Sequence, residues 1–201
     1  NETTSEYDDA SNLIRETDDR GISTVTLYDG MNRPVAVYDE ADREGTVINT
    51  FYDATSGCES SFCSNGEGQT VLMTYPGVGD EPIVERFGYD LRGRLVVSSR
   101  LLKGYDFVLN NSYDNADRLL NITYPDGRSI DYQYDNADRL TMIEGVVTEV
   151  THDVRSQVSQ IVYADGTRTT TDYDENQRIT QRLTRDAMDV VLQGFEYSYD
   201  R

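Results

Sequence analysis

The same seven residues occur twice in this chain, at a fixed interval. The motif Tyr-Asp-Asn-Ala-Asp-Arg-Leu begins at Tyr113 and again at Tyr134, 21 residues later. A period of this length is typical of repeat proteins, in which each unit covers its apolar surface against the neighbouring units. The sequence therefore predicts an array of similar units rather than a single globular core.

Weaker copies of the motif extend the array in both directions. Most keep a Tyr-Asp pair and an Arg four residues after the Asp, and His152 takes the tyrosine position in one copy. A degenerate copy begins at Tyr7, an off-phase copy at Tyr38 and a cut-off copy at Tyr199, and Tyr52 keeps only its Asp. The predicted turn residues are Tyr28, Asp29, Arg33, Tyr89, Asp90, Gly93, Arg94, Tyr113, Asp114, Arg118, Tyr134, Asp135, Arg139, His152, Asp153, Tyr173, Asp174 and Arg178.

Each motif predicts the end of a strand followed by a tight turn. Residues 129–134 alternate, with Ile130, Tyr132 and Tyr134 on one side, which is the period of a strand. The Asp after the tyrosine can accept hydrogen bonds from backbone N–H groups further along the turn. The third residue after that Asp is expected to adopt a left-handed conformation, and the following Arg to pair with the Asp. The residues expected to be left-handed are Asn32, Gly93, Asp117, Asp138 and Gln177.

A second turn is predicted halfway between two motifs. Asp126-Gly127 and Asp165-Gly166 lie between alternating segments, and Asp-Gly is a strong hairpin signal. The chain is therefore expected to be all-β, an antiparallel meander with no helical period. The predicted strands are residues 23–28, 35–38, 46–52, 84–89, 95–102, 105–113, 119–124, 129–134, 140–143, 146–151, 157–163, 167–173, 179–183 and 190–199.

The motif also resembles that of a known family. Residues 89–95 fit the pattern Tyr-Asp-x-x-Gly-Arg-Leu at every defining position. This pattern resembles the YD repeat of the Rhs/YD-repeat superfamily, which includes bacterial polymorphic toxins, the cocoon component of insecticidal toxin complexes and animal teneurins. The resemblance is specific over residues 89–180 and degenerate over 1–52. It implies repeats that coil into a spiral sheet forming a shell or tube wall, with a role in encapsulation or cell-surface recognition.

The predicted organisation is a single array over residues 1–201. Residues 1–53 are degenerate repeats, 54–80 an inserted loop and 81–201 regular repeats. The loop contains Cys58 and Cys63 among turn-forming residues, which favours a local disulfide and an oxidising compartment. Half of a zinc site is the alternative, although two Cys and one His supply too few ligands to close one.

Charge restricts the partners. The net charge of −19 opposes binding to nucleic acid or to an anionic membrane surface, because phosphates would be repelled. No apolar run is long enough for a membrane-spanning helix, so no membrane insertion is expected. An extracellular, secreted location is expected, in which Asn1, Asn110 and Asn121 are candidate glycosylation sites because each begins an Asn-x-Ser/Thr triplet.

Catalysis is not expected. The single histidine, His152, occupies a tyrosine position of the repeat, and no nucleophile elbow, P-loop or dinucleotide-binding motif is present. Larger bacterial members of the family carry a self-cleaving aspartyl site near Asp-Pro-x-Gly, and this sequence contains no Asp-Pro. No cofactor is expected, and Ca²⁺ at the turn aspartates is the alternative because this ion prefers oxygen ligands.

Three functions fit the sequence. The first is a non-catalytic extracellular structural protein whose open strand edges pair with other copies to build a filament, tube or sheath. The second is a fragment of a larger YD-repeat shell, continued by a longer chain, that encloses a toxin or mediates recognition. The third is a glycan-binding module that uses exposed tyrosine rings, which the absence of Trp disfavours.

Overall fold

The described part of the chain forms two compact units. The computed structural model describes residues 3–53, 62–77, 79 and 81–200. Unit 1 spans residues 1–111 with 124–126, and unit 2 spans residues 112–123 with 127–201. No helix among the described residues has the length and hydropathy needed to cross a membrane.

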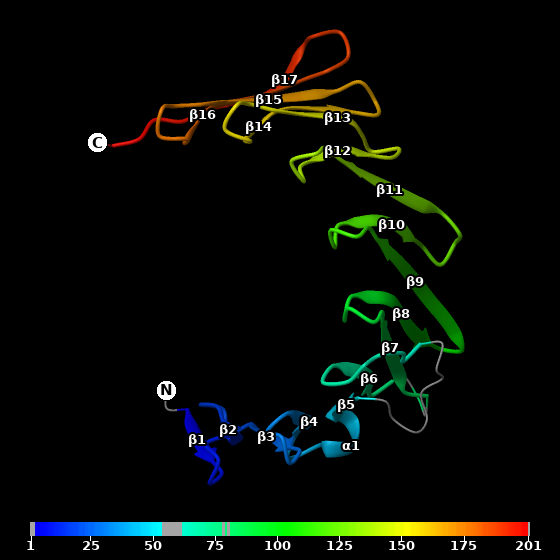
Figure 1. The fold of residues 1–201 in the computed structure, drawn as a ribbon. Coiled ribbons are helices and arrows are strands. Elements are labelled where there is room, and N and C mark those ends of the chain that lie inside the picture. Colours follow the sequence, from blue (N-terminus) through cyan, green and yellow to red (C-terminus); the bar gives the residue numbers. More distant parts are fainter. Residues whose placement is uncertain (1–2, 54–61, 78, 80, 201) are drawn as a thin grey trace. The chain divides into compact units, whose positions relative to one another are not determined.

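Both units are antiparallel meanders in which each strand pairs with the next one in the sequence (Figure 1). The expected all-β fold is confirmed. The first unit contains β1 (Thr4–Tyr7), β2 (Leu13–Thr17), β3 (Ser23–Tyr28), β4 (Pro34–Asp39), α1 (Arg43–Thr46), β5 (Ile48–Tyr52), β6 (Thr70–Tyr75), β7 (Ile83–Tyr89), β8 (Leu95–Leu102) and most of β9 (Tyr105–Tyr113). The second contains β10 (Leu119–Thr123), β11 (Ser129–Tyr134), β12 (Leu140–Ile143), β13 (Val147–His152), β14 (Val158–Tyr163), β15 (Arg168–Tyr173), β16 (Ile179–Arg185) and β17 (Val191–Glu196).

The odd-numbered strands run into the Tyr-Asp turns. In each unit these turns therefore lie along one edge of the sheet, namely the edge formed by the ends of the strands. The strand register shifts by one residue at the tyrosine, for example between Gln133 and Tyr134 and between Asp172 and Tyr173. Such a bulge re-aims the side chain and increases the local twist. The tyrosine ring is thereby placed by the bulge as well as by strand alternation.

Three predictions about the first eighty residues need correction. Residues 70–75, assigned to the inserted loop, form β6, whose β-branched and aromatic residues suit a pleated sheet. Strands β1 and β2 were absent from the expected set. The off-phase copy after Tyr38 lies at the opposite edge and leads into the one-turn helix α1, where the Asp42 carboxylate accepts a hydrogen bond from the Gly45 N–H at 3.0 Å.

The sheet has little buried core. Among the described residues, the buried hydrophobic side chains are Ala36, Cys63, Val71, Val97 and Val147, and of these Val71 alone is completely buried. A sheet in a single layer leaves much of both faces accessible, unlike a two-layer domain. Its stability therefore depends on links within the layer, which the turns supply.

Candidate functional site

The Tyr-Asp turns, called YD turns here, share one hydrogen-bond pattern. In each predicted turn, one carboxylate oxygen of the Asp accepts backbone N–H groups from the residues two and four positions later, at 2.8–3.0 Å. A short aspartate side chain that binds its own turn in this way replaces the backbone partners that the turn lacks. The six aspartates concerned are Asp29, Asp90, Asp114, Asp135, Asp153 and Asp174.

The third residue after each of these aspartates is left-handed, as expected for five of them. Asn32 has φ 61°, Asp117 65°, Asp138 62°, Gln177 66° and Gly93 76°. The non-glycine residues are mostly Asn and Asp, which tolerate this conformation best. The turn chemistry read from the sequence is therefore confirmed at these positions.

The other carboxylate oxygen pairs with the turn arginine. In the turn at Asp135, Nε of Arg139 donates to Oδ2 of Asp135 at 2.7 Å, and Nη2 of Arg139 lies 2.6 Å from the same oxygen. Equivalent pairs join Arg33 to Asp29, Arg94 to Asp90, Arg118 to Asp114 and Arg178 to Asp174.

Hydrogen bonds of this kind lower the pKa of five turn aspartates, namely Asp29, Asp90, Asp114, Asp135 and Asp174. The side-chain and backbone hydrogen bonds from Arg139 lower the pKa of Asp135 to about 2. The pKa of Asp90 is lowered mainly by the Arg94 side chain, and that of Asp29 mainly by the Arg33 backbone N–H. These five carboxylates are consequently ionised at neutral pH and hydrogen-bonded within the turn, which suits a structural role better than proton transfer.

The tyrosine that precedes the turn reaches back to the previous repeat. The hydroxyl of Tyr134 donates to the backbone carbonyl of Leu119 at 3.0 Å, and Leu119 opens the strand after the preceding YD turn. We call this contact the tyrosine link. The same link joins Tyr28 to Leu13, Tyr52 to Pro34, Tyr89 to Thr70, Tyr173 to Val158 and Tyr199 to Ile179, at 2.8–3.1 Å.

The turn arginine reaches forward to the next repeat. Besides its own Asp, Arg118 pairs with Asp138 at 2.7 Å and lies over the Tyr134 ring at 4.9 Å. Arg33 makes the same two contacts, with Asp53 at 3.0 Å and with the Tyr52 ring at 4.3 Å. Within each unit, the YD turns joined by these links are called the YD ladder, in which the tyrosine and arginine side chains tie one turn to the next.

The turn at His152 departs from this pattern. No hydrogen bond or ion pair of the His152 side chain occurs within the described residues, so the tyrosine link is missing there. Gln157 stands in the arginine position and donates to the backbone oxygen of Gln177 at 3.1 Å. Arg155 adds a bond to the Glu175 carbonyl at 3.1 Å. The forward link is therefore retained with different residues.

The opposite edge of the sheet carries the predicted hairpin turns and two similar turns that sequence reasoning missed. Gly127 and Gly166 are left-handed, with φ of 82° and 83°, and the Thr167 N–H donates to Asp165 at 2.8 Å. Asp126 lies in the turn before Gly127. At Asp18 and Asp186 the YD-type carboxylate pattern recurs without a preceding tyrosine. An Asp followed three residues later by Gly or Asp was the available signal.

The predicted insertion interrupts the turn that follows Tyr52, since the Asp53 N–H donates to the Gln69 carbonyl at 3.0 Å. Residues 62–66 form the insert stem, which docks on β7: the Tyr89 N–H donates to the Ser64 carbonyl at 2.9 Å, and the Asn65 amide donates to the Tyr89 carbonyl at 2.8 Å. Cys63 is disulfide-bonded and buried, and its sulfur lies 3.2 Å from the Val71 carbonyl oxygen. The predicted partner, Cys58, lies outside the described residues.

The remaining predicted sites are not brought together. Asn110 is exposed on β9. Asn121 donates its amide to Ser129 and Asp131, and its own amide oxygen accepts the Thr123 hydroxyl at 3.0 Å. Asn1 lies outside the described residues. Across the described ranges, no three His, Cys, Asp or Glu side chains group as metal ligands would.

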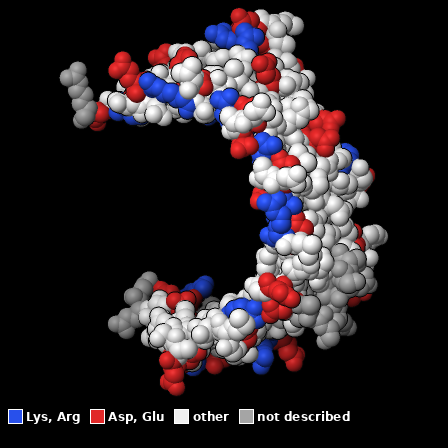
Figure 2. All heavy atoms as spheres, in the orientation of Figure 1, with Lys and Arg blue, Asp and Glu red and all other residues white. Residues whose placement is uncertain are grey.

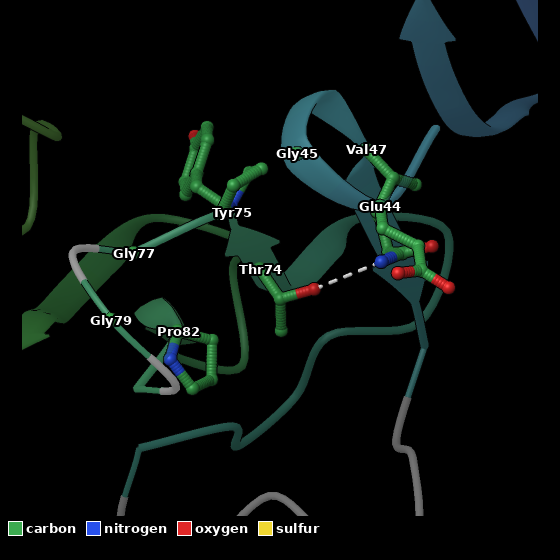
Figure 3. A pocket seen from close by; sticks show the side chains of 10 residues that line it. Glu44, Gly45, Val47, Thr74, Tyr75, Gly77, Gly79 and Pro82 are labelled. Atoms are coloured by element: carbon green, nitrogen blue, oxygen red, sulfur yellow. Dashed lines mark hydrogen bonds between the residues drawn. The ribbon is translucent and has the colours of Figure 1, made fainter. Parts of the chain in front are cut away.

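Charged side chains are mixed on the surface (Figure 2), and among the described residues the cavity beside α1 contains a single carboxylate. Basic and acidic side chains lie beside one another on the face in Figure 2, as the ion pairs of the YD ladder require. Figure 3 shows a cavity of about 470 Å³ between α1, β6 and the loop that follows. Its Asn49 amide donates to the Thr74 hydroxyl at 3.1 Å, and Glu44 is the one charged residue of its lining. A single carboxylate beside neutral groups does not form an acid–base pair.

Comparisons with known proteins agree with the resemblance to YD repeats. Residues 113–146 match the family described as RHS Repeat. No curated protein matches the chain significantly. The crystal structure of TcdB2-TccC3 aligns with a TM-score of 0.77 and 19% sequence identity, covering 98% of this chain and 11% of that chain. The values for TcdB2-TccC3-Cdc42 are 0.76, 19%, 98% and 11%. For the Tc holotoxin pore of Photorhabdus luminescens they are 0.63, 19%, 98% and 12%.

The extent of these matches limits what they show. At 19% identity the likeness establishes the fold. This chain spans little more than a tenth of the chains it matches, at 11–12% of their length.

Proposed function

We propose that this chain, whose residues 113–146 are an RHS repeat, is a wall segment of a larger YD-repeat shell. The observation that carries the proposal is the YD ladder. Each predicted turn binds its own backbone, and side-chain bonds such as Tyr134–Leu119 and Arg118–Asp138 tie one repeat to the next, so the structure is built to be extended repeat by repeat. Such a wall encloses or displays another molecule and has no chemistry of its own to perform.

The thin core favours the same function. A single-layer sheet with few buried side chains gains stability by adding neighbours along the layer rather than by adding a second layer. The similar structures are chains about nine times longer, of which this chain covers 11%. Both observations favour a segment within a long array over an independent domain.

The filament hypothesis ranks second. It requires the free edges of β1 and β17 to pair between copies, as exposed strand edges do. The six residues of β17 are all exposed, which provides an edge for pairing. The similar structures give no support to this assembly, and it stays a prediction. A glycan-binding role also stays a prediction.

An extracellular location belongs to this proposal. The disulfide-bonded Cys63 supports it, because disulfides persist in oxidising environments. The non-enzymatic role is proposed on the same footing, from the ionised and fully engaged turn carboxylates.

Electron microscopy tests the proposal. The natural polypeptide that contains this chain should appear as closed hollow particles whose walls include these repeats, at every protein concentration tested. The 201-residue chain alone should remain as single particles over the same range. Filaments that lengthen with the concentration of the 201-residue chain would instead favour self-assembly, and solid particles without a lumen would refute the shell.

A further inference from the structure

An amphipathic cavity lies on the face of β7–β9 in unit 1. Two cross-strand rows form its floor, one of Glu85, Arg100 and Phe107 and the other of Phe87, Ser98 and Leu109. Alternate residues of a strand point to the same face, so both rows lie on one side of the sheet. Tyr124 and Pro125 complete the lining, and the cavity volume is about 430 Å³. This volume falls in the range of pockets that hold small organic molecules, about 300–1,000 Å³.

The polar groups at this cavity form a chain of contacts from Tyr75 through Glu85 to Arg100. The Tyr75 hydroxyl donates to one carboxylate oxygen of Glu85 at 2.9 Å, and the other oxygen lies 3.2 Å from Nε of Arg100. Burial and this hydrogen bond raise the pKa of Tyr75, so its hydroxyl remains a donor at neutral pH. Glu85 is therefore satisfied by two protein groups and orients the arginine.

The arginine is left with unused donors. Within the described residues, the contact with Glu85 is the only ion pair or hydrogen bond that Arg100 makes. Its side chain is 55% exposed, and its terminal nitrogens Nη1 and Nη2 are open to a ligand. The turn arginines of the YD ladder, by contrast, pair with an Asp of their own turn and are half-buried.

We propose that this cavity binds an aromatic carboxylate, with Arg100 holding the carboxylate and Phe87, Phe107 and Leu109 contacting the ring. A guanidinium presents two parallel N–H donors that match the two oxygens of a carboxylate. Aromatic and aliphatic side chains are the common lining for a flat apolar ligand. Because Glu85 contacts Nε, the two terminal nitrogens of Arg100 remain to hold the two oxygens of one carboxylate.

The absence of tryptophan from this chain provides the assay. N-acetyl-L-tryptophan carries an indole ring and one carboxylate. Excited at the long-wavelength edge of the indole band, where the 15 tyrosines of the chain absorb little, the mixture emits from the ligand. N-acetyl-L-tryptophanamide has the same ring without the charge. Titration of the 201-residue chain into each probe gives the two dissociation constants. The acid should bind saturably and at least about tenfold more tightly than the amide, because hydrogen bonds to charged groups are the stronger ones.

Variants locate the site. Arg100→Gln should raise the dissociation constant of the acid about tenfold and leave that of the amide unchanged. Arg182→Gln is the matched control, because Arg182 also faces a phenylalanine, Phe195, across two paired strands but does not line this cavity. It should change neither constant. Arg100→Lys keeps the positive charge but lacks the two parallel N–H donors of a guanidinium. Circular dichroism checks that each variant is folded.

Two probes separate the sources of the ligand. A glycine-rich peptide that ends in tryptophan with a free carboxylate should bind at least as tightly as N-acetyl-L-tryptophan if the site receives polypeptide C-termini. Weaker binding of the peptide assigns the site to small acids. Equal affinity for the acid and the amide would overturn the proposal. So would equal losses in the two Gln variants, or no saturation of the probe at the highest concentration of the chain in the titration.

Discussion

Replacing Tyr134 by phenylalanine tests whether the tyrosine link stabilises the YD ladder. The hydroxyl of Tyr134 donates to the Leu119 carbonyl at 3.0 Å, and the Arg118 guanidinium lies 4.9 Å from the ring centre. Tyr134→Phe removes the hydroxyl and retains the ring, so the contact with the guanidinium is retained. The substitution therefore isolates one hydrogen bond between consecutive repeats.

The expected cost follows from that bond. A hydrogen bond between neutral groups contributes about 0.5–1.5 kcal/mol, and a partly buried acceptor left without a donor raises the loss toward about 2 kcal/mol. Leu119 is partly buried, so we expect the free energy of unfolding to fall by about 1–2 kcal/mol. For a chain of this size, 1 kcal/mol corresponds to a lowering of Tm by about 2–4 °C.

The control lies two residues earlier in the same strand. Tyr132 is on the same face and equally half-buried, and its hydroxyl has no hydrogen bond within the described residues. Tyr132→Phe should change the free energy of unfolding by less than about 0.5 kcal/mol. Equal losses for the two variants would refute the reasoning, because the effect would then belong to any tyrosine of the strand.

Urea unfolding followed by circular dichroism measures both variants. Repeat arrays do not always unfold in one step, so hydrogen exchange of the β10 and β11 amides should accompany it. Protection should fall in these strands for Tyr134→Phe and remain unchanged for Tyr132→Phe. A loss of protection spread evenly over unit 2 would show that the link acts globally rather than between two repeats.

Three further substitutions or conditions address other parts of the structure. His152→Tyr should restore the missing tyrosine link to the carbonyl of Leu140 and raise the free energy of unfolding by about 0.5–1.5 kcal/mol in urea, whereas His152→Phe should not. Gly88→Ala would place a Cβ 2.6 Å from a backbone oxygen of the insert stem and should cost about 1–3 kcal/mol, measured by the same unfolding; Gly30→Ala, with nothing within 4 Å, is its control. The turn aspartates make stability fall in acid, because a carboxyl whose folded pKa is lowered contributes fully above its unfolded value and loses that contribution as the pH falls toward the folded one. For Asp135, with about 2 in the folded chain and about 3.9 unfolded, the urea midpoint should be constant from pH 7 to about 5 and fall between about pH 4 and 2, and Asp135→Asn should reduce that fall.

Local chemistry is what the sequence predicts well. The turn at Asp135 needs an acceptor at the start, a left-handed residue at Asp138 and an arginine within reach, and these lie within five residues of one another. Strands such as β8, β9 and β11 were predicted with the observed bounds because alternation and the flanking turns define them. Such features do not depend on the rest of the molecule.

Contacts between repeats were harder to predict from the sequence. The shift of register at Tyr134 and the bond from its hydroxyl to Leu119 depend on how two strands are paired, which alternation alone does not specify. The length of the insertion was overestimated because its Gly- and Ser-rich residues obscured the short strand β6. The insert stem was missed for the same kind of reason, since its docking on Tyr89 joins residues 24–25 positions apart.

The links of the YD ladder also explain how its sequence can change while its fold is kept. At His152 the tyrosine link and the Arg–Asp pair are both replaced, yet Arg155 and Gln157 still bond to the following turn. Each turn is attached to its neighbours by two or more independent bonds, so the loss of one lowers stability by a fraction of the total. A motif recognisable over residues 113–146 can therefore decay elsewhere in the chain, and a structural likeness covering 98% of it survives at 19% identity. The feature common to all six predicted YD turns is the aspartate that binds its own backbone, so the fold depends on this residue more than on the tyrosine or the arginine.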